Sequence, residues 1–270
     1  MQQVISNIRK TVRLHQPLIH CITNPISINQ CANGILAVGA RPMMAEHPKE
    51  VSEITQTAQA LMLNLGNITD ARMESMLIAA KTAKEKRIPF LLDAVGIACS
   101  GLRREYVKDL LNTAVPTVIK GNYSEIQAFS QQSYHSSGVD ADSGLDIQTI
   151  DHAAVSLAKD LHTIILASGK VDIVTDGKSL YHICNGTSQL SQVTGTGCLQ
   201  GALCTAYLSA KPGLEAVITG SSVLGICGEL AQTDRGNGTF LCNLMDALST
   251  LTDAAIKELL NLEEIDIEKI

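Results

Sequence analysis

The sequence predicts one α/β domain over residues 1–270, with a mostly parallel central sheet and helices on both of its faces. Three observations support this fold class. Apolar runs of four to seven residues alternate along the chain with segments of helical period. The runs are nearly continuous in apolar residues, which is typical of parallel strands buried on both faces. No linker and no internal repeat divides the chain into smaller units.

The first half of the chain alternates strands and helices after an amphipathic start at residues 1–15. Gly39 is expected to end one helix, because glycine often follows a helix C-terminus. Asp70 can cap another, since a short carboxylate accepts N–H groups where a helix begins. We expect strands at 17–23, 41–45, 60–66, 88–96 and 116–122, and helices at 27–39, 50–59, 70–86 and 104–114.

The second half adds a hairpin and a helical C-terminal layer. Residues 130–146 are polar and contain glycine, so we expect a surface excursion there. A helix at 148–160 leads to a strand at 163–169, and Asp176-Gly177 marks a hairpin turn within 171–183. From Gly197 onward the chain is expected to be nearly all helix, at 198–210, 214–232 and 240–251.

Composition argues against several classes of protein. The net charge is −6 and no dense Lys/Arg run occurs, so neither a nucleic-acid partner nor an anionic membrane is expected. No apolar run approaches the roughly 20 residues that a membrane span needs. The cysteines form no CxxC pair and the histidines no HxH or HExxH motif, so a structural zinc site is not expected. Free thiols without a secretory signal predict a cytoplasmic protein.

Polar or glycine-rich groups occupy four expected strand ends, where ligands bind in open α/β sheets. They are Asp93, the segment KGNYSEI at 120–126, Ser168, and the segment VTGTGC at 193–198. In the last segment, Gly195 and Gly197 let backbone N–H groups converge at a helix start, which makes a cradle for a phosphate or a developing negative charge. The alternative is a tight strand-to-helix turn with Cys198 as a small buried residue.

The segment KGNYSEI allows two interpretations. Asn122 and Glu125 lie three residues apart and share one face of a helix, where an amide oxygen and a carboxylate could hold Mg²⁺ through its waters. Lys120 could meet a phosphate as a point charge. Equally, Asn122 could cap a surface helix with Glu125 as its capping-box partner. Asp93 is likewise either a second magnesium-facing carboxylate or part of a capped turn.

Six segments of the chain form a combined pattern. They are PLIHCITNPISINQCANGILAVGARPMMA at 17–45, ALMLNLG, LLDAVG, KGNYSEI, LASGKVDIVTDG and VTGTGC. Together they resemble the hydroxyethylthiazole kinases of the ribokinase-like superfamily, and the first block is the part most particular to that family. The resemblance implies a single ribokinase-like domain that transfers the γ-phosphoryl of ATP to the primary hydroxyl of 5-(2-hydroxyethyl)-4-methylthiazole, a step of thiamine salvage. It also implies a homotrimer with the thiazole bound between subunits.

The resemblance also implies roles for individual residues. Cys198 would lie at the reacting hydroxyl and act as its base. Met44, Gly195 and Asn24 would bind the thiazole. ATP would be contacted by Lys120, Ser168, Thr196 and Gly197, and the cofactor Mg²⁺ would be held by Asp93, Asn122 and Glu125.

A thiol at position 198 departs from the aspartate that most kinases of the superfamily carry there. Cys198 can serve because phosphoryl transfer has a loose transition state that needs little early deprotonation. A helix N-terminus also lowers the pKa of a cysteine from its reference of ~8.5, which predicts some thiolate near neutral pH. Cys198 is therefore expected to be a weak base.

Three further departures from the pattern of the hydroxyethylthiazole kinases are two single residues and one loop. Lys120 and Ser168 stand where arginine and threonine are usual, which keeps the charge and the hydroxyl. The motif that normally reads DPVGAGAT is DAVGIACSG here, so Ala94 replaces a proline, and Ile97 and Ala98 alter a glycine-rich loop. The altered loop favours one alternative function, a nucleotide-binding relative without turnover.

Other enzymes of the same fold provide the remaining alternatives. An ATP- or ADP-dependent dehydratase of nicotinamide hydrates normally has aspartate at the position of Cys198 and lacks the CITN block at 21–24. Kinases for hydroxymethylpyrimidine or pyridoxal are chemically closer, but they fit the first block poorly.

Overall fold

Parallel strands form the centre of the molecule in the computed structural model, which describes residues 1–130 and 146–270. Within these ranges nine strands make one sheet in the order β2-β1-β3-β4-β5-β6-β7-β8-β9. The first six in this order are parallel, and β7, β8 and β9 each run antiparallel to the strand before. The strands are β1 Leu18–Ile22, β2 Arg41–Met43, β3 Ala60–Asn64, β4 Phe90–Asp93, β5 Val118–Asn122, β6 Ile164–Ser168, β7 Asp172–Thr175, β8 Leu180–Ile183 and β9 Leu262–Ile265.

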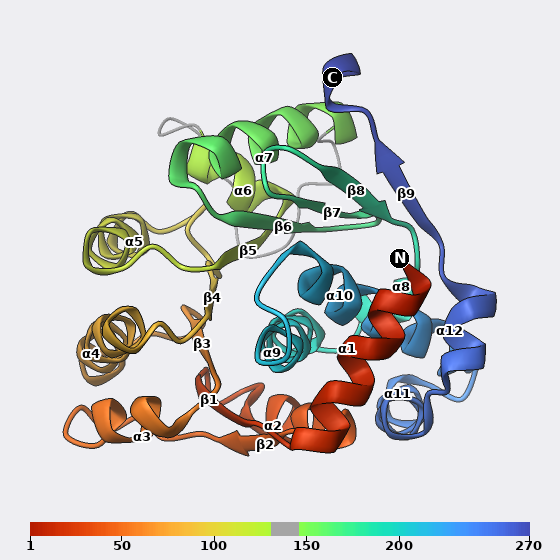
Figure 1. The fold of residues 1–270 in the computed structure, drawn as a ribbon, viewed down its shortest axis with the longest axis horizontal. Helices are drawn as coiled ribbons and strands as arrows, with labels where there is room; N and C mark the ends of the chain where they lie inside the picture. The colour runs from red at the N-terminus through yellow and green to blue at the C-terminus, as the bar shows by residue number, and fades with distance from the viewer. Residues whose placement is uncertain (131–145) are drawn as a thin grey trace.

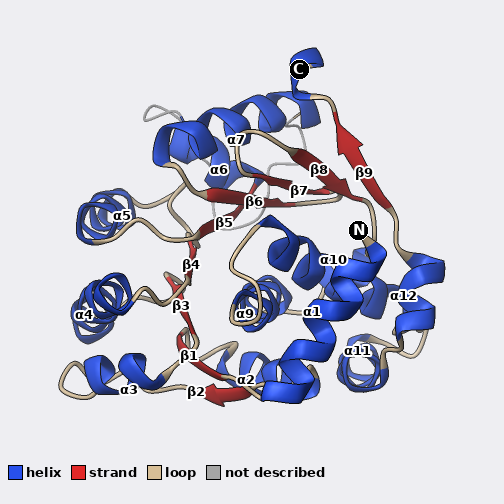
Figure 2. Ribbon diagram, viewed as in Figure 1, coloured by secondary structure: helices blue, strands red, loops and turns tan. Residues whose placement is uncertain are grey.

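Helices cover both faces of this sheet. The helices of the described ranges are α1 Gln2–His15, α2 Ile28–Ala37, α3 Val51–Thr57, α4 Asp70–Lys86, α5 Gly101–Thr113, α6 Tyr123–Ser130, α7 Ile147–Leu161, α8 Ser188–Ser191, α9 Thr196–Leu208, α10 Leu214–Leu230, α11 Asn237–Thr250 and α12 Asp253–Leu259. Figure 1 shows α3, α4 and α5 on one side of β1, β3 and β4, with α9 on the other side. Figure 2 colours the helices blue and the strands red, which shows the sheet between its two layers of helices.

Two hydrophobic layers share the strands, because successive side chains of a strand point to opposite faces. In β3, Leu61 and Leu63 pack into the layer that contains α4, while Met62 packs into the layer that contains α9. All three side chains are fully buried. Both faces of β3 are therefore covered, which explains why its sequence shows a continuous apolar run instead of alternation.

Helix α9 lies inside the molecule, and almost every residue along it is buried. A helix that is apolar on all sides belongs in the interior. Its neighbour α10 approaches closely, because a Cβ at Gly220 would lie 2.7 Å from the Cα of Cys204. The burial of α9 places its N-terminus, which carries Cys198, against the parallel strands.

Much of the predicted fold is confirmed. The sheet is mostly parallel with helices on both faces, as expected. The hairpin between β7 and β8 forms at Asp176-Gly177, where Gly177 adopts a φ of +84°. Residues 131–145, most of the expected polar excursion, lie outside the described residues. In the ranges that are described, the helices are too short or too polar to span a membrane.

Three local expectations are wrong. Thr69 caps α4 in place of Asp70, because Thr69 is the extended residue before the helix and its side chain accepts the Arg72 N–H. The glycine turn follows the short helix α8 and not a strand. Residues 262–265, in a region expected to be nearly all helix but assigned to none of the named helices, form the edge strand β9, since their backbone pairs with β8 and the sequence LEEI shows no strand alternation.

Candidate active site

Three adjacent parallel strands bring polar side chains together at their carboxyl ends. Asn64 ends β3 in register with Asp93, which ends β4, and Asp93 is in register with Lys120 of β5. Lys120 Nζ lies 3.2 Å from Asp93 Oδ1, and the amide nitrogen of Asn64 donates to Asp93 Oδ2 at 2.8 Å. All three side chains are buried. This edge of the sheet therefore holds a buried ion pair with an amide beside it.

Burial and charge act in opposite directions on this ion pair. Burial raises the pKa of Asp93, and the charge of Lys120 opposes that effect. Burial disfavours the ammonium charge of Lys120, but Asp93, with smaller contributions from Cys198 and Glu125, outweighs it and raises the pKa of Lys120. Lys120 is therefore a permanent cation inside the molecule.

The glycine turn at the start of α9 faces this ion pair. Gly195 has a φ of +94°, and a Cβ there would collide with Oε1 of Gln30 and lie 3.1 Å from Cβ of Ser27. A Cβ at Gly197 would lie 3.8 Å from Lys120 Nζ. The positive end of a helix and an ammonium group thus point at the same place, which is an arrangement that attracts an anion such as phosphate.

Cys198 lies in the first turn of α9, and its sulfur contacts two asparagines. The side-chain nitrogens of Asn24 and Asn64 each lie 3.3 Å from the sulfur. The chain positions 24, 64 and 198 are distant in sequence and meet where β1, β3 and α9 converge. Cys198 is therefore not a filler residue isolated in apolar packing, although it also borders the large hydrophobic core.

The pKa of Cys198 is shifted in the direction opposite to the one expected from the sequence. Burial, followed by the nearby charge of Asp93, raises the pKa of the thiol, although Ser27, Lys120 and Asn24 act in the opposite direction. The helix N-terminus was expected to lower this pKa. Desolvation dominates because the sulfur lies inside the molecule, so the protein without ligands holds Cys198 as a thiol.

Asn122 and Glu125 form a reciprocal capping box at the start of α6. The Glu125 N–H donates to Asn122 Oδ1 at 2.9 Å, and the Asn122 N–H donates to Glu125 Oε2 at 2.7 Å. The other carboxylate oxygen, Oε1, accepts the Gly96 N–H at 2.7 Å. Burial, and then the charge of Asp93, raises the pKa of Glu125 to about 7. The capping box, one of the two interpretations of this pair, is therefore formed. Glu125 in addition connects α6 to the loop after β4.

The altered loop DAVGIACSG is well anchored. Ala94, where a proline is usual, donates its N–H to the carbonyl oxygen of Lys120 at 2.8 Å, which a proline could not do. Arg104 of α5 donates to the carbonyl oxygens of Ile97 at 2.8 Å and Ala98 at 3.0 Å. The side chains of Ile97 and Ala98 are buried. The substitutions therefore leave a defined loop, held on one side by α5 and on the other by β5.

Three further predicted residues lie at or just beyond the ends of strands and at the start of a helix. Ser168 ends β6 in register with Asn122, and its hydroxyl donates to the Gly121 carbonyl at 3.3 Å. Thr196 directs its hydroxyl at the carbonyls of Leu190 and Val193, so the side chain stabilises the glycine turn itself. Met44 follows the edge strand β2, half buried against the core that Cys198 also borders.

Sequence reasoning missed Asn64 and Gln30. The signal for Asn64 was its position as the last residue of the apolar run ALMLN, where a buried amide needs partners. The nearby Gly66 was the more visible residue, and its N–H is in fact bound by Asn64 Oδ1 at 2.8 Å. No local pattern marks Gln30, because only its distance to Gly195 across the fold gives it significance.

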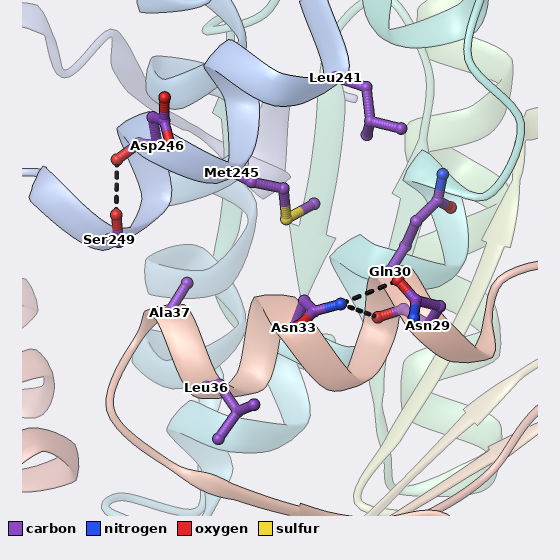
Figure 3. A pocket seen from close by; sticks show the side chains of 9 residues that line it. All are labelled: Asn29, Gln30, Asn33, Leu36, Ala37, Leu241, Met245, Asp246 and Ser249. Atoms are coloured by element: carbon purple, nitrogen blue, oxygen red, sulfur yellow. Dashed lines mark hydrogen bonds between the residues drawn. The ribbon is translucent and has the colours of Figure 1, made fainter. Parts of the chain in front are cut away.

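A cavity of about 470 Å³ lies beside the glycine turn, between α2 and α11. Figure 3 shows its lining, with the side chain of Gln30 at one end. The other lining residues are Asn29, Asn33, Leu36, Ala37, Leu241, Met245, Asp246 and Ser249. The lining does not include Cys198, Asp93 or Lys120, so the cavity is separate from the buried cluster. Gln30 is the lining residue that also lies against Gly195 of the glycine turn.

The fold and this site together define a ribokinase-like kinase. Its features are a mostly parallel sheet, a buried Lys120–Asp93 pair at the carboxyl edge, and a glycine turn that directs the N-terminus of α9 at that edge. The sequence model of the hydroxyethylthiazole kinase family matches residues 9–254. The chain belongs to the hydroxyethylthiazole kinase family.

Individual relatives agree with this assignment. The chain is 45% identical over 255 residues to hydroxyethylthiazole kinase 2 of Clostridium botulinum strain Hall, covering 92% of this chain and 96% of that protein. Hydroxyethylthiazole kinase 1 of Methanosphaera stadtmanae is 37% identical over 268 residues, covering 93% and 94%. The solved structure of the hydroxyethylthiazole kinase protein from Pyrococcus horikoshii OT3 superposes with a TM-score of 0.90 at 30% identity, covering 98% of this chain and 100% of that one.

A more distant neighbour shares the fold alone. The pyridoxal kinase from Staphylococcus aureus, solved in complex with ADP, has a TM-score of 0.64 at 17% identity. The shared arrangement of strands and helices therefore extends beyond the hydroxyethylthiazole kinases.

Proposed function

We propose that the protein transfers the γ-phosphoryl group of ATP to the primary hydroxyl of 5-(2-hydroxyethyl)-4-methylthiazole, giving the thiazole phosphate used in thiamine salvage. Membership of the hydroxyethylthiazole kinase family supports this activity. The structural observation that carries it is the position of Cys198 in the first turn of α9, beside the cation of Lys120, whose charge favours the thiolate form that could accept a proton. Acceptor and anion site are then adjacent, as transfer of a phosphoryl group between two oxygens requires.

ATP is proposed to bind where positive charge gathers. The first N–H groups of a helix have no partner within it, so the α9 start at Thr196 and Gly197 offers donors to phosphate oxygens. Lys120 adds an ammonium group near Gly197. Ser168 lies two strands from Asp93, at the same carboxyl edge of the sheet, where its hydroxyl can meet another part of the nucleotide.

The alcohol is proposed to bind on the other side of Cys198. Asn24 contacts the sulfur directly, and Gly195 opens the turn beside it. Met44, at the end of β2, supplies an apolar and polarisable surface for an aromatic ring. As a thiolate, the form that the charge of Lys120 favours, Cys198 accepts the hydroxyl proton while the alcohol oxygen bonds to the γ-phosphorus, and the bond from that phosphorus to the ADP oxygen breaks.

The residues proposed to hold Mg²⁺ fit an ion that keeps its water shell. Burial raises the pKa of Asp93, and burial followed by the charge of Asp93 raises the pKa of Glu125, so a nearby divalent cation would favour the charged forms of both. Their oxygens already accept N–H groups of the protein, which favours contact through water over direct ligation. The described residues contain no cluster of three or more His, Cys, Asp or Glu arranged to hold a metal directly. Bound with ATP, the ion would supply positive charge to the phosphates.

A homotrimer with active sites between subunits is proposed as the working form. Ile26 and Met43 are large apolar side chains exposed at 66% and 38% near the substrate side, and Leu36 of α2 is exposed at 55%. Contact with a neighbouring subunit would cover such side chains. The proposed location is the cytoplasm, because all eight cysteines lie in the described ranges and are free thiols.

Magnesium-dependent release of ADP from ATP tests the proposal. The assay is run with 5-(2-hydroxyethyl)-4-methylthiazole, with the alcohols of pyridoxal and hydroxymethylpyrimidine, and without any alcohol. We expect the thiazole to give the largest kcat/KM. ATP binding without alcohol-dependent ADP release would instead support a nucleotide-binding protein, and turnover on a hydrated nicotinamide cofactor would support a dehydratase.

A further inference from the structure

Asn64 occupies the centre of the buried cluster and belongs to none of the proposed substrate, nucleotide or metal contacts. Its side chain is completely buried at the end of β3. Its nitrogen lies 2.8 Å from Asp93 Oδ2 and 3.3 Å from the Cys198 sulfur. One amide group thus touches the carboxylate of the ion pair and the thiol of the glycine turn.

The orientation of this amide is determined by its surroundings. Asn64 Oδ1 accepts the Gly66 N–H at 2.8 Å, and a backbone N–H can only donate. The nitrogen must therefore be the end that faces Asp93 and Cys198. A second donor, Asn24 Nδ2, lies 3.1 Å from the same Oδ1 and prevents the amide from turning over.

Asn24 is oriented in the same way. Its Oδ1 accepts the N–H groups of Ile26 at 3.1 Å and Ser27 at 3.0 Å. Its nitrogen therefore faces Asn64 and the Cys198 sulfur, at 3.1 and 3.3 Å. A directed chain of donors results, which begins at the backbone of residues 26 and 27 and ends at Asp93.

We propose that Asn64 is a positioning residue that holds the sulfur of Cys198 and the carboxylate of Asp93 at a fixed separation, so that alcohol and nucleotide meet in line. The inference rests on the proposed role of Cys198. The amide nitrogens of Asn24 and Asn64 both contact the sulfur, so the hydroxyl of the alcohol must approach it from another direction. Placement of this kind affects turnover more than binding, because misplaced reacting groups lower the rate steeply.

A double-mutant cycle tests this proposal. The wild type, Asn64→Ala, Cys198→Ala and the double variant are compared for kcat and KM. We expect Asn64→Ala to lower kcat by about tenfold or more while KM for ATP and for the alcohol changes by less than about threefold. In the Cys198→Ala background the same substitution should change the residual kcat by less than about twofold, because one of the two groups whose separation Asn64 sets is gone.

Asn185→Ala is the matched control. Asn185 is also a buried asparagine, but its amide bonds Glu229, Leu259 and Asn261, away from Cys198. Its loss is expected to lower the melting temperature about as much as Asn64→Ala does and to leave kcat near that of the wild type. Should Asn64→Ala fail to fold, Asn64→Leu replaces it, since leucine keeps nearly the shape of asparagine, removes the donor and, unlike aspartate, adds no second carboxylate beside Asp93.

Each failure of the cycle has its own meaning. Equal fractional losses in the two backgrounds, or a rise in KM without a fall in kcat, would overturn the positioning role of Asn64. Full turnover of Asn64→Ala beside a damaged Cys198→Ala would do the same and leave the role of Cys198 intact. Near-normal turnover of Cys198→Ala would remove the role of Cys198, and the inference with it.

Discussion

Lys120 Nζ lies 3.2 Å from Asp93 Oδ1, and both side chains are almost completely shielded from solvent at the carboxyl edge of the parallel strands. Neither charge could be buried at this depth without the other. The N-terminus of α9 lies near the ammonium group of this pair, since a Cβ at Gly197 would be 3.8 Å from Lys120 Nζ. An anionic ligand at the helix end would therefore meet both the helix dipole and the ammonium group.

Removal of Lys120 should therefore affect both stability and nucleotide binding. We expect Lys120→Met to lower the free energy of unfolding by about 3–5 kcal/mol, because a buried carboxylate is left unpaired, and to raise KM for ATP. Urea unfolding and steady-state kinetics measure the two effects. Lys120→Arg is the control, and it should retain most of both properties because it keeps the charge. A Lys120→Met protein of unchanged stability would show that Asp93 does not need this cation.

Substitution of Cys198 tests its chemical role. We expect Cys198→Ala to fold normally and to lower kcat by about 10- to 100-fold, since only a weak base is lost. Cys198→Asp should keep or raise turnover, because a carboxylate is charged at a pH where the buried thiol is protonated. Initial rates of ADP release and far-UV circular dichroism provide the measurements. An alanine variant with the wild-type kcat would mean that the thiol serves packing alone.

Gly195 is predicted to tolerate no side chain. Gly195→Ala should cost about 1–3 kcal/mol from the left-handed backbone alone, and the Cβ would in addition collide with Gln30. Adding Gln30→Ala should recover the part of the loss that is due to the collision. Gly101→Ala is the control, since nothing lies within 4 Å of a Cβ there and α5 begins at that residue. Urea unfolding compares the four proteins, and equal effects of Gly195→Ala and Gly101→Ala would contradict the prediction.

The raised pKa of Glu125 predicts that the free energy of unfolding depends on pH. Its pKa rises from 4.5 to about 7 on folding, so between these values the folded state binds more protons than the unfolded state. The contribution of Glu125 to stability therefore falls as the pH rises from about 4.5 to about 7 and is constant above that, with a slope of at most about 1.4 kcal/mol per pH unit. Glu125→Gln should remove this slope.

Urea unfolding of the wild type and Glu125→Gln at pH 5 and pH 7 measures the difference in slope. The absolute stability of the variant is not the readout, because glutamine replaces one acceptor oxygen with a donor facing Gly96 or Asn122. Glu105→Gln, on the exposed face of α5, is the control and should leave the slope unchanged. Identical pH profiles for the wild type and Glu125→Gln would exclude the carboxyl as the source.

Strand ends were predictable because buried parallel strands leave a plain pattern in the sequence. The apolar runs before Asp93 and before Lys120 could be read as neighbouring strands, and their polar last residues then meet at one edge. The glycine turn was predictable for a similar reason, since Gly195 and Gly197 precede a long apolar helix. Features that depend on a local pattern of residues could therefore be predicted from the sequence.

Contacts between distant segments were not predictable in this way. Asn64 gains its partners from residues 24, 93 and 198, and no local spacing records that meeting. For Asn122 and Glu125, sequence spacing fits a metal site and a capping box equally well, and only coordinates show that the box is formed. The short strand β9 likewise depends on pairing with β8 and not on its own side-chain pattern.

The bond from the Ala94 amide to the Lys120 carbonyl extends the ladder between β4 and β5 by one rung beyond Asp93. A proline in this place would carry no exchangeable proton. This chain therefore has a built-in reporter at the edge of its candidate active site. The deuterium uptake of that single amide would record how often the strand ends separate, and whether nucleotide holds them closed.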